Sequence, residues 1–136
     1  MAVERSLILI KPDAVERGLA GEILERIEAR GVKLRAGKLM RVDRQLGETH
    51  YAEHREKPFF GDLVDFITSG DVVVAKLTGR EAVTVLRTLL GATDPVKSGP
   101  GTIRGDLGIE IQENLVHGSD SPESAERELG LFFPSD

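Results

Sequence analysis

The sequence predicts an α/β (α+β) sandwich of the ferredoxin-like type, in which a βαββαβ chain forms a four-stranded antiparallel sheet. Short apolar or alternating segments, which are typical of strands, take turns along the chain with segments of helical period. Two consecutive helical segments near the middle predict an inserted helical hairpin. A stretch without clear period, residues 91–108, contains several glycines and prolines and predicts a long loop.

The first third of the chain reads as strand, helix and strand. Residues 6–10 form a short apolar run that ends at Lys11-Pro12, as expected of a buried strand. Residues 21–29 carry apolar side chains on one helical face and are followed by Gly31, a typical helix stop. Residues 32–42 alternate roughly between apolar and basic side chains, which predicts a half-exposed strand.

The helical hairpin comes next. Residues 45–55 form a polar helical stretch closed by Pro58, and residues 60–67 place apolar side chains at i, i+3, i+4 and i+7. Residues 72–75 are the most strand-like run of the chain.

The last third begins with a helix and ends with one. Residues 81–90 return to helical spacing before the loop of residues 91–108. Residues 114–117 predict a short last strand. Ser121 then predicts the N-cap of a final helix, with Pro122 in its first position and an acidic residue in its first turn.

The bulk properties favour a single domain spanning residues 1–136, the size at which a core forms without disulfides. The chain has no cysteine, which excludes disulfides, thiolate zinc sites and a cysteine nucleophile, and fits a reducing cytoplasm. The apolar run at residues 7–10 is far shorter than the roughly 20 residues of a membrane span. A net charge of −5 argues against general nucleic-acid binding.

Two of the three histidines, His50 and His54, lie in the sequence H-Y-A-E-H, which matches the H-x-x-E-H pattern of some zinc peptidases. On one helix, side chains four positions apart share a face and could reach the same metal. The alternative is a polar helix surface that happens to carry two histidines. The pattern is short, and the sequence indicates no third ligand.

The third histidine, His117, ends an apolar segment and precedes a glycine and a helix start, a place suited to meeting an anion. Arg87, Thr93 and Arg104 lie in or beside the long loop, and with Lys11 they could form a cationic pocket for phosphate. Neither a Walker A sequence nor a G-x-G-x-x-G loop is present. The residues alone therefore indicate a phosphate site with a histidine nucleophile.

The sequence resembles the nucleoside diphosphate kinase family over nearly its whole length. The segments that carry the resemblance keep the family's order and spacing, and they are K-P-D (residues 11–13), H-Y-A-E (50–53), K-P-F-F (57–60), L-G-A-T (90–93), P-G-T-I-R-G-D (100–106) and N-L-V-H-G-S-D-S (114–121) with E-S-A-E-R-E (123–128).

The resemblance implies a ping-pong phosphotransferase that moves the γ-phosphoryl group from a nucleoside triphosphate to a nucleoside diphosphate through phosphorylated His117, with broad base and sugar tolerance. It implies Nδ1 as the attacking atom, with Glu128 and Ser119 orienting the ring. The other roles that it implies fall on residues around the nucleotide: phosphate contacts from Arg87, Thr93 and Arg104, charge and a ribose contact from Lys11, support of the phosphate side from Tyr51, sugar contacts from Asn114, and base contacts from Phe59 and Leu63.

The resemblance also implies that Mg²⁺ arrives with the nucleotide and is bound by phosphate oxygens and water, with no protein side chain as ligand. The expected partners are nucleoside di- and triphosphates and further copies of the chain. A hexamer is favoured over a tetramer, with the loop around Pro95 near subunit contacts. A non-catalytic interaction module of the same fold is the main alternative, but it would require loss of the histidine or its basic partners.

Overall fold

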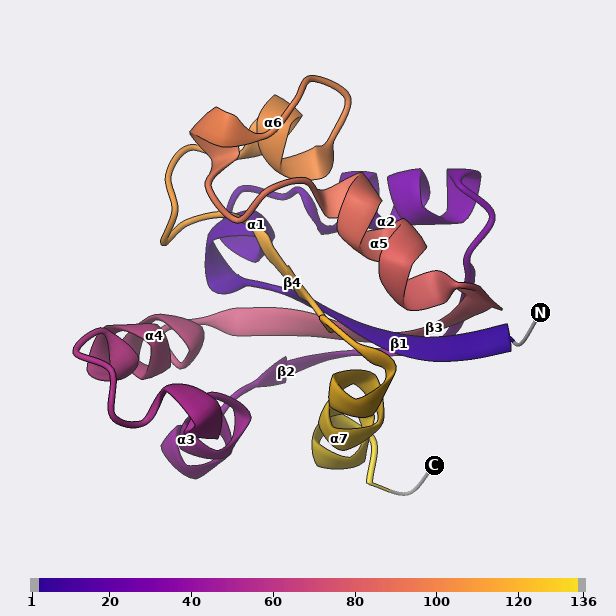
Figure 1. Cartoon of the computed structure of the whole chain (residues 1–136). Coiled ribbons are helices and arrows are strands. Elements are labelled where there is room, and N and C mark those ends of the chain that lie inside the picture. Colours follow the sequence, from indigo (N-terminus) through magenta and orange to yellow (C-terminus); the bar gives the residue numbers. More distant parts are fainter. Residues whose placement is uncertain (1–2, 135–136) are drawn as a thin grey trace.

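The computed structural model describes residues 3–134, which form a four-stranded antiparallel sheet with helices on both faces (Figure 1). The strands are β1 (Val3–Ile10), β2 (Lys33–Arg41), β3 (Asp71–Arg80) and β4 (Val116–Gly118), in the order β2-β3-β1-β4. All three strand pairs are antiparallel. The predicted ferredoxin-like sheet is thus confirmed.

The helices form two layers. One layer contains α1 (Pro12–Glu16), α2 (Ala20–Ala29), α5 (Ala82–Leu90) and α6 (Ile103–Leu107), and the other contains α3 (Arg44–His50), α4 (Phe60–Ile67) and α7 (Pro122–Phe132). Two single-turn 3₁₀ helices, η1 (Ala52–His54) and η2 (Pro95–Lys97), lie in the connections.

The central strand β1 explains why its sequence is a continuous apolar run. Leu7 and Leu9 pack with α4 and α7 on one face of the sheet, while Ile8 and Ile10 pack with α2 and α5 on the other. A strand covered on both faces has no polar side to present. All four side chains are fully buried.

The outer strand β2 differs from its prediction as a half-exposed strand. Nearly all of its side chains are exposed, including Leu39 at 64% of its full accessible surface. The physical reason is its place at the edge of the sheet, where it pairs only with β3, with an irregularity of register between Leu34 and Ala36. Alternation in the sequence therefore did not correspond to one buried face.

Three local predictions were wrong. The helix predicted over residues 45–55 ends at His50 and resumes only as η1. Helix α1 was not predicted, and its five residues are too few to show a period. The predicted loop of residues 91–108 contains η2 and α6; Thr102 caps α6 by accepting a hydrogen bond from the Gly105 amide.

Other boundaries agree with the sequence. Helix α4 has the predicted bounds, and α7 begins as predicted, with Ser121 accepting a hydrogen bond from the Ser124 amide and Pro122 in the first turn.

Across residues 3–134, no helix has the length and apolar character that crossing a membrane requires.

Candidate active site

His117 lies in the middle of β4, opposite Leu9 of β1. The strand is only three residues long and forms one edge of the sheet. The His117 side chain is 24% exposed and faces a cavity. Its position is therefore fixed by the sheet, while its ring remains reachable from solvent.

The segment before β4 is held by the turn that follows β1. Leu115 adopts a φ of 77°, which is costly for a side chain of this size. Its amide donates to Asp13 Oδ2 at 3.1 Å, and its carbonyl accepts from the Lys11 amide at 2.8 Å. These two bonds stabilise the left-handed backbone two residues before His117. Asp13 belongs to the K-P-D segment of the resemblance, but no role was predicted for it.

The His117 ring is oriented by a buried carboxylate. Its Nε2 lies 3.0 Å from Glu128 Oε2, and Ser119 Oγ donates to Glu128 Oε1 at 2.6 Å. An ionised carboxylate only accepts hydrogen bonds, so the proton of the neutral imidazole belongs on Nε2. Nδ1 then carries the free lone pair.

Glu128 is ionised in this setting. Burial raises the pKa of Glu128, but the hydrogen bond and charge of His117, together with the hydrogen bond from Ser119, outweigh burial and leave the pKa below its usual value. A charged acceptor strengthens the bond from His117.

A second histidine, His50, packs against the first. The two ring centroids are 4.8 Å apart at nearly right angles, and the His50 ring also contacts Tyr51 and Phe132. Burial, and then the charge of His117, lower the pKa of His50 to about 3. His50 is therefore neutral at physiological pH. The sequence suggested His50 either as a zinc ligand or as part of a polar helix surface, and neither its burial nor its contact with His117 was predicted.

His117 forms part of the wall of a cavity of about 510 Å³. The cavity brings together nine of the eleven residues that the family resemblance assigned to the site, and the complete lining is Lys11, Tyr51, His54, Phe59, Leu63, Arg87, Thr93, Arg104, Ile111, Gln112, Asn114, His117 and Gly118. The other two, Ser119 and Glu128, are buried behind the His117 ring. Ile111, Gln112 and Gly118 had no predicted role, and His54 had been considered only for the zinc pattern and not for this cavity.

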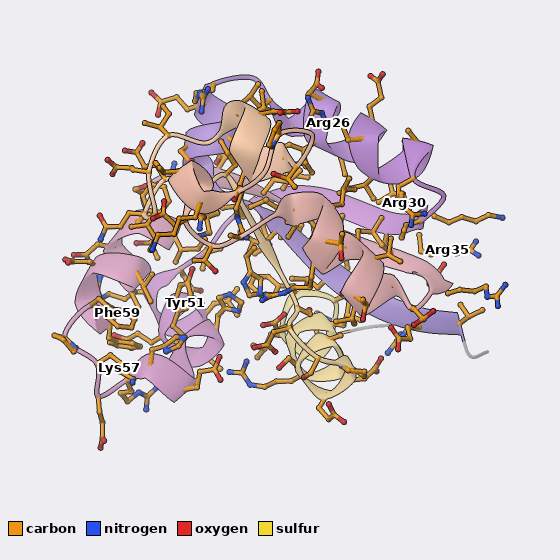
Figure 2. The ribbon with its side chains drawn as sticks, turned by 45° about the horizontal axis from the view of Figure 1, so that its top comes forward. Arg26, Arg30, Arg35, Tyr51, Lys57 and Phe59 are labelled. Carbon is orange, nitrogen blue, oxygen red and sulfur yellow. The ribbon has the colours of Figure 1, made fainter. Side chains whose placement is uncertain are left out.

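The cavity has a polar end and an apolar end. Tyr51 and Phe59 lie together on the side of α3 and α4, and Arg26, Arg30 and Arg35 lie well away from them (Figure 2). Phe59 is 42% exposed, so one ring face is open to a ligand. Burial raises the pKa of Tyr51 to about 12, which keeps its phenol protonated.

Two buried cations define the polar end. Burial, and then the charge of Arg104, lower the pKa of Lys11 to about 8. Burial, and then the charge of Arg87, lower the pKa of Arg104 to about 10. Both groups remain charged at neutral pH, and their mutual repulsion favours an anion between them.

The polar end is tied together by hydrogen bonds. Lys11 Nζ donates to Asn114 Oδ1 at 2.9 Å, and Asn114 Nδ2 donates to the Thr93 carbonyl at 2.9 Å. Arg104 donates to three backbone carbonyls, those of Asn114, Val116 and Gly91. These contacts link β1, the loop after α5, α6 and β4 around one space.

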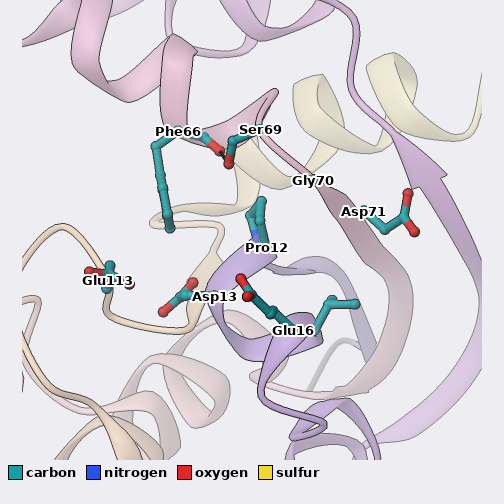
Figure 3. A pocket seen from close by; sticks show the side chains of 9 residues that line it. Pro12, Asp13, Glu16, Phe66, Ser69, Gly70, Asp71 and Glu113 are labelled. Atoms are coloured by element: carbon teal, nitrogen blue, oxygen red, sulfur yellow. Dashed lines mark hydrogen bonds between the residues drawn. The ribbon is translucent and has the colours of Figure 1, made fainter.

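A second cavity, of about 300 Å³, lies beside α1 (Figure 3). Its lining includes the carboxylates of Asp13, Glu16, Asp71 and Glu113. A site with this charge repels phosphate, so the nucleotide-sized anion site is the cavity at His117.

The arrangement of His50 and His54 does not fit the zinc peptidase hypothesis. Helix α3 ends at His50, so the two side chains do not share one helical face. His50 is buried against His117, whereas the His54 side chain is 38% exposed with its ring 5.6 Å from that of Phe59. The pattern in the sequence therefore does not correspond to a paired ligand set.

Comparison with known proteins gives a single family. The sequence model described as nucleoside diphosphate kinase matches residues 4–136. The nucleoside diphosphate kinase of Parafrankia sp. is 59% identical over 134 residues, which cover 98% of each chain. That of Archaeoglobus fulgidus is 54% identical over 134 residues, covering 98% of this chain and 89% of the relative.

Solved structures agree with the sequences. The nucleoside diphosphate kinase of Halobacterium salinarum, solved in complex with CDP, has a TM-score of 0.96 and 49% identity, covering 99% of this chain and 90% of its own. The enzyme of Aquifex aeolicus has a TM-score of 0.94 and 43% identity, covering 97% and 96%. This chain therefore belongs to the nucleoside diphosphate kinase family, the phosphotransferases that move a γ-phosphoryl group between nucleotides through a phosphohistidine.

Proposed function

We propose that His117 Nδ1 is the nucleophile of this phosphotransferase. Nδ1 attacks the γ-phosphorus of a nucleoside triphosphate, the N–P bond forms, and the bond to the bridging oxygen breaks as the nucleoside diphosphate leaves. A second diphosphate then attacks the phosphohistidine with a terminal oxygen of its β-phosphate and restores the free imidazole. The strongest support is the hydrogen bond between His117 Nε2 and Glu128, which leaves Nδ1 unprotonated.

Glu128 and Ser119 act as positioning residues. As the imidazole gains positive character on phosphorylation, the Glu128 carboxylate stabilises the Nε2–H that faces it. The Ser119 hydroxyl fixes the other carboxylate oxygen and so prevents the carboxylate from rotating away.

The phosphates occupy the polar end of the cavity. Lys11, Arg87 and Arg104 supply charge, and Thr93 supplies a hydroxyl at the rim. Phosphoryl transfer depends mainly on positioning and on neutralising charge spread over the phosphate oxygens, which this group of donors provides. Tyr51 lies next to His50, which packs against His117, and from there it supports the phosphate side as a neutral donor.

The nucleoside occupies the apolar end. Phe59 and Leu63 hold the base by stacking and apolar contact, and Asn114, with Lys11, reaches the sugar hydroxyls. Stacking tolerates every base because each has a π-face. We expect broad base and sugar tolerance for this reason.

The lining of the cavity fits a magnesium ion that is bound by the nucleotide and not by protein side chains. No carboxylate occurs among the described residues that line the cavity. Mg²⁺ prefers oxygen ligands, and phosphates and water would supply them here. The ion neutralises phosphate charge when bound, while orientation of the nucleotide is left to the protein donors named above.

The experiment that tests this proposal is incubation with γ-labelled ATP and magnesium, followed by acid and alkali treatment. Label on nitrogen should be lost in acid, survive alkali and leave on addition of GDP. His117→Gln should take up no label while still binding ATP, and His54→Gln should still carry label. A folded wild-type protein without label would favour a non-catalytic module of the same fold.

We further propose that the chain is one domain that acts in the cytoplasm as a homo-oligomer, with a hexamer favoured over a tetramer. Exposed apolar side chains near the loop of residues 91–108 support self-association: Val96 is 82% exposed, Ile109 61% and Ile111 57%. Light scattering should give six times the chain mass. A monomer or tetramer mass would reject the hexamer.

A further inference from the structure

His50 is a buried polar side chain with unmet hydrogen-bonding capacity. It is 3% exposed, and neither ring nitrogen has a hydrogen-bond partner within residues 3–134. Buried polar atoms of this kind are rare in folded proteins and call for an explanation such as a bound ion. The phosphotransfer mechanism derived above does not use either nitrogen.

The unpartnered ring lies in a cluster of metal-ligand atoms. His50, His117 and Glu128 each offer one such atom, and the three lie within 4.8 Å of one another. A cleft of about 120 Å³ reaches these residues, and its lining also includes Tyr51, Glu53, His54, Arg87, Gly118 and Asp120. The cluster therefore has both a donor set and a route of entry.

We propose that a divalent transition-metal ion such as Zn²⁺ binds between His50, His117 and Glu128. Two imidazoles and one carboxylate form a ligand set that suits zinc and related ions, with water in a fourth position. Magnesium, which prefers oxygen ligands, does not compete well for imidazole. Ligands around a tetrahedral zinc lie about 3.3 Å apart, so the side chains close in by small rotations on binding.

The bound ion blocks phosphoryl transfer, an effect that rests on the function proposed above. His117 faces Glu128 through Nε2, so this is the nitrogen that the ion takes. A neutral imidazole has one proton, and coordination at Nε2 moves that proton to Nδ1. Nδ1 then has no lone pair for the γ-phosphorus. The ion thus holds His117 in the unreactive tautomer while the nucleotide cavity stays open.

The binding test is calorimetric titration of the whole protein with ZnCl₂ in the presence of excess magnesium. We expect one zinc per chain in the wild type and in His54→Leu, a matched control that removes the neighbouring exposed histidine. His50→Leu should weaken binding at least about tenfold, because loss of a group that only orients a metal ligand already costs that much. Loss of the His50 ring breaks no hydrogen bond among residues 3–134. Circular dichroism checks folding, and His50→Gln replaces the leucine variant if that one unfolds.

The inhibition test compares the rate of each variant with zinc against its own rate with a chelator. Zinc should inhibit the wild type and His54→Leu reversibly, and His50→Leu should need at least about tenfold more zinc. An active wild type that binds no zinc, or equal binding by His50→Leu, overturns the metal site and leaves the phosphotransferase intact. Zinc binding that depends on His50 in a protein that transfers no phosphate would overturn the proposed function instead.

Discussion

Replacement of Glu128 by glutamine tests whether its charge supports the nucleophile. The carboxylate accepts hydrogen bonds from His117 at 3.0 Å and Ser119 at 2.6 Å, and it is only 5% exposed. A hydrogen bond to a charged group contributes about 1.5–3 kcal/mol and a neutral one about 0.5–1.5 kcal/mol. Glu128→Gln should therefore lose about 1.4 kcal/mol of transition-state stabilisation at His117. This loss corresponds to a rate of phosphorylation about tenfold lower.

The side-chain amide of the Glu128→Gln variant can adopt two orientations. The Ser119 hydroxyl both donates and accepts, so the NH₂ group can face it and leave the carbonyl for His117 Nε2. The opposite orientation would place NH₂ against His117 and favour the proton on Nδ1. A wrong tautomer costs far more, about 10⁴-fold in a comparable triad. About tenfold is therefore the smallest loss expected.

The assay is rapid-quench measurement of phosphohistidine formation from saturating γ-labelled ATP in a single turnover. Glu126→Gln is the matched control, because this glutamate lies on the same helix but is exposed and paired with Arg5. It should phosphorylate within about twofold of the wild type, as expected of a surface pair. A Glu128→Gln rate within the same range, with folding intact, would refute the orienting role of the carboxylate.

Three further predictions concern binding and stability. The pKa of Lys11 is lowered to about 8, chiefly by burial, so its positive charge is present below that pH and lost above it. ATP affinity measured by titration should fall as pH rises through about 8, and Lys11→Met should flatten the profile; a flat wild-type profile would contradict this. Gly105→Ala places a Cβ 2.1 Å from the Gly99 carbonyl and should destabilise by about 2 kcal/mol or more in thermal unfolding. Gly130→Ala meets nothing within 4 Å and should stabilise by about 0.5–1 kcal/mol; equal melting of the two variants would argue against the close contact. Phe59→Ala should weaken ATP, GTP and CTP alike by about tenfold, and a loss confined to one base would exclude simple stacking.

The elements that the sequence predicted well are those whose burial imposes a period. Helix α4 carries an apolar face over its full length, and the apolar half of β1 lies at the centre of the sheet. The first residues of β1 pair with β3 through backbone hydrogen bonds. Such bonds do not depend on the side-chain pattern, so the sequence did not predict this part of the strand. Helices α1 and α6 have five residues each, less than two turns, so periodicity could not reveal them.

The residues alone predicted a phosphate site at His117, and the other members of the candidate site were predicted through family resemblance. Its residues come from α4, α5, α6, β4 and α7 and from connections such as those after β1 and after α3, and no local pattern states that these segments meet. Asp13 was missed because its carboxylate acts on a backbone amide about 100 positions away. His50 was misread because its partner is His117, not His54. Both errors concern contacts that only the tertiary fold creates.

The three backbone contacts of Arg104 have a thermodynamic consequence. A guanidinium has five N–H donors. In the folded protein, without any ligand, the Arg104 guanidinium already donates to the carbonyls of Gly91, Asn114 and Val116. The entropy lost in immobilising so long a side chain, about 1.5–2 kcal/mol, is therefore lost on folding and not on nucleotide binding. Phe59 at the other end stays half exposed and free to adapt. If Arg104 binds phosphate and Phe59 binds the base, as proposed above, the phosphate site is preorganised while the base contact can adapt, so different nucleotides can bind without rearrangement of the phosphate site.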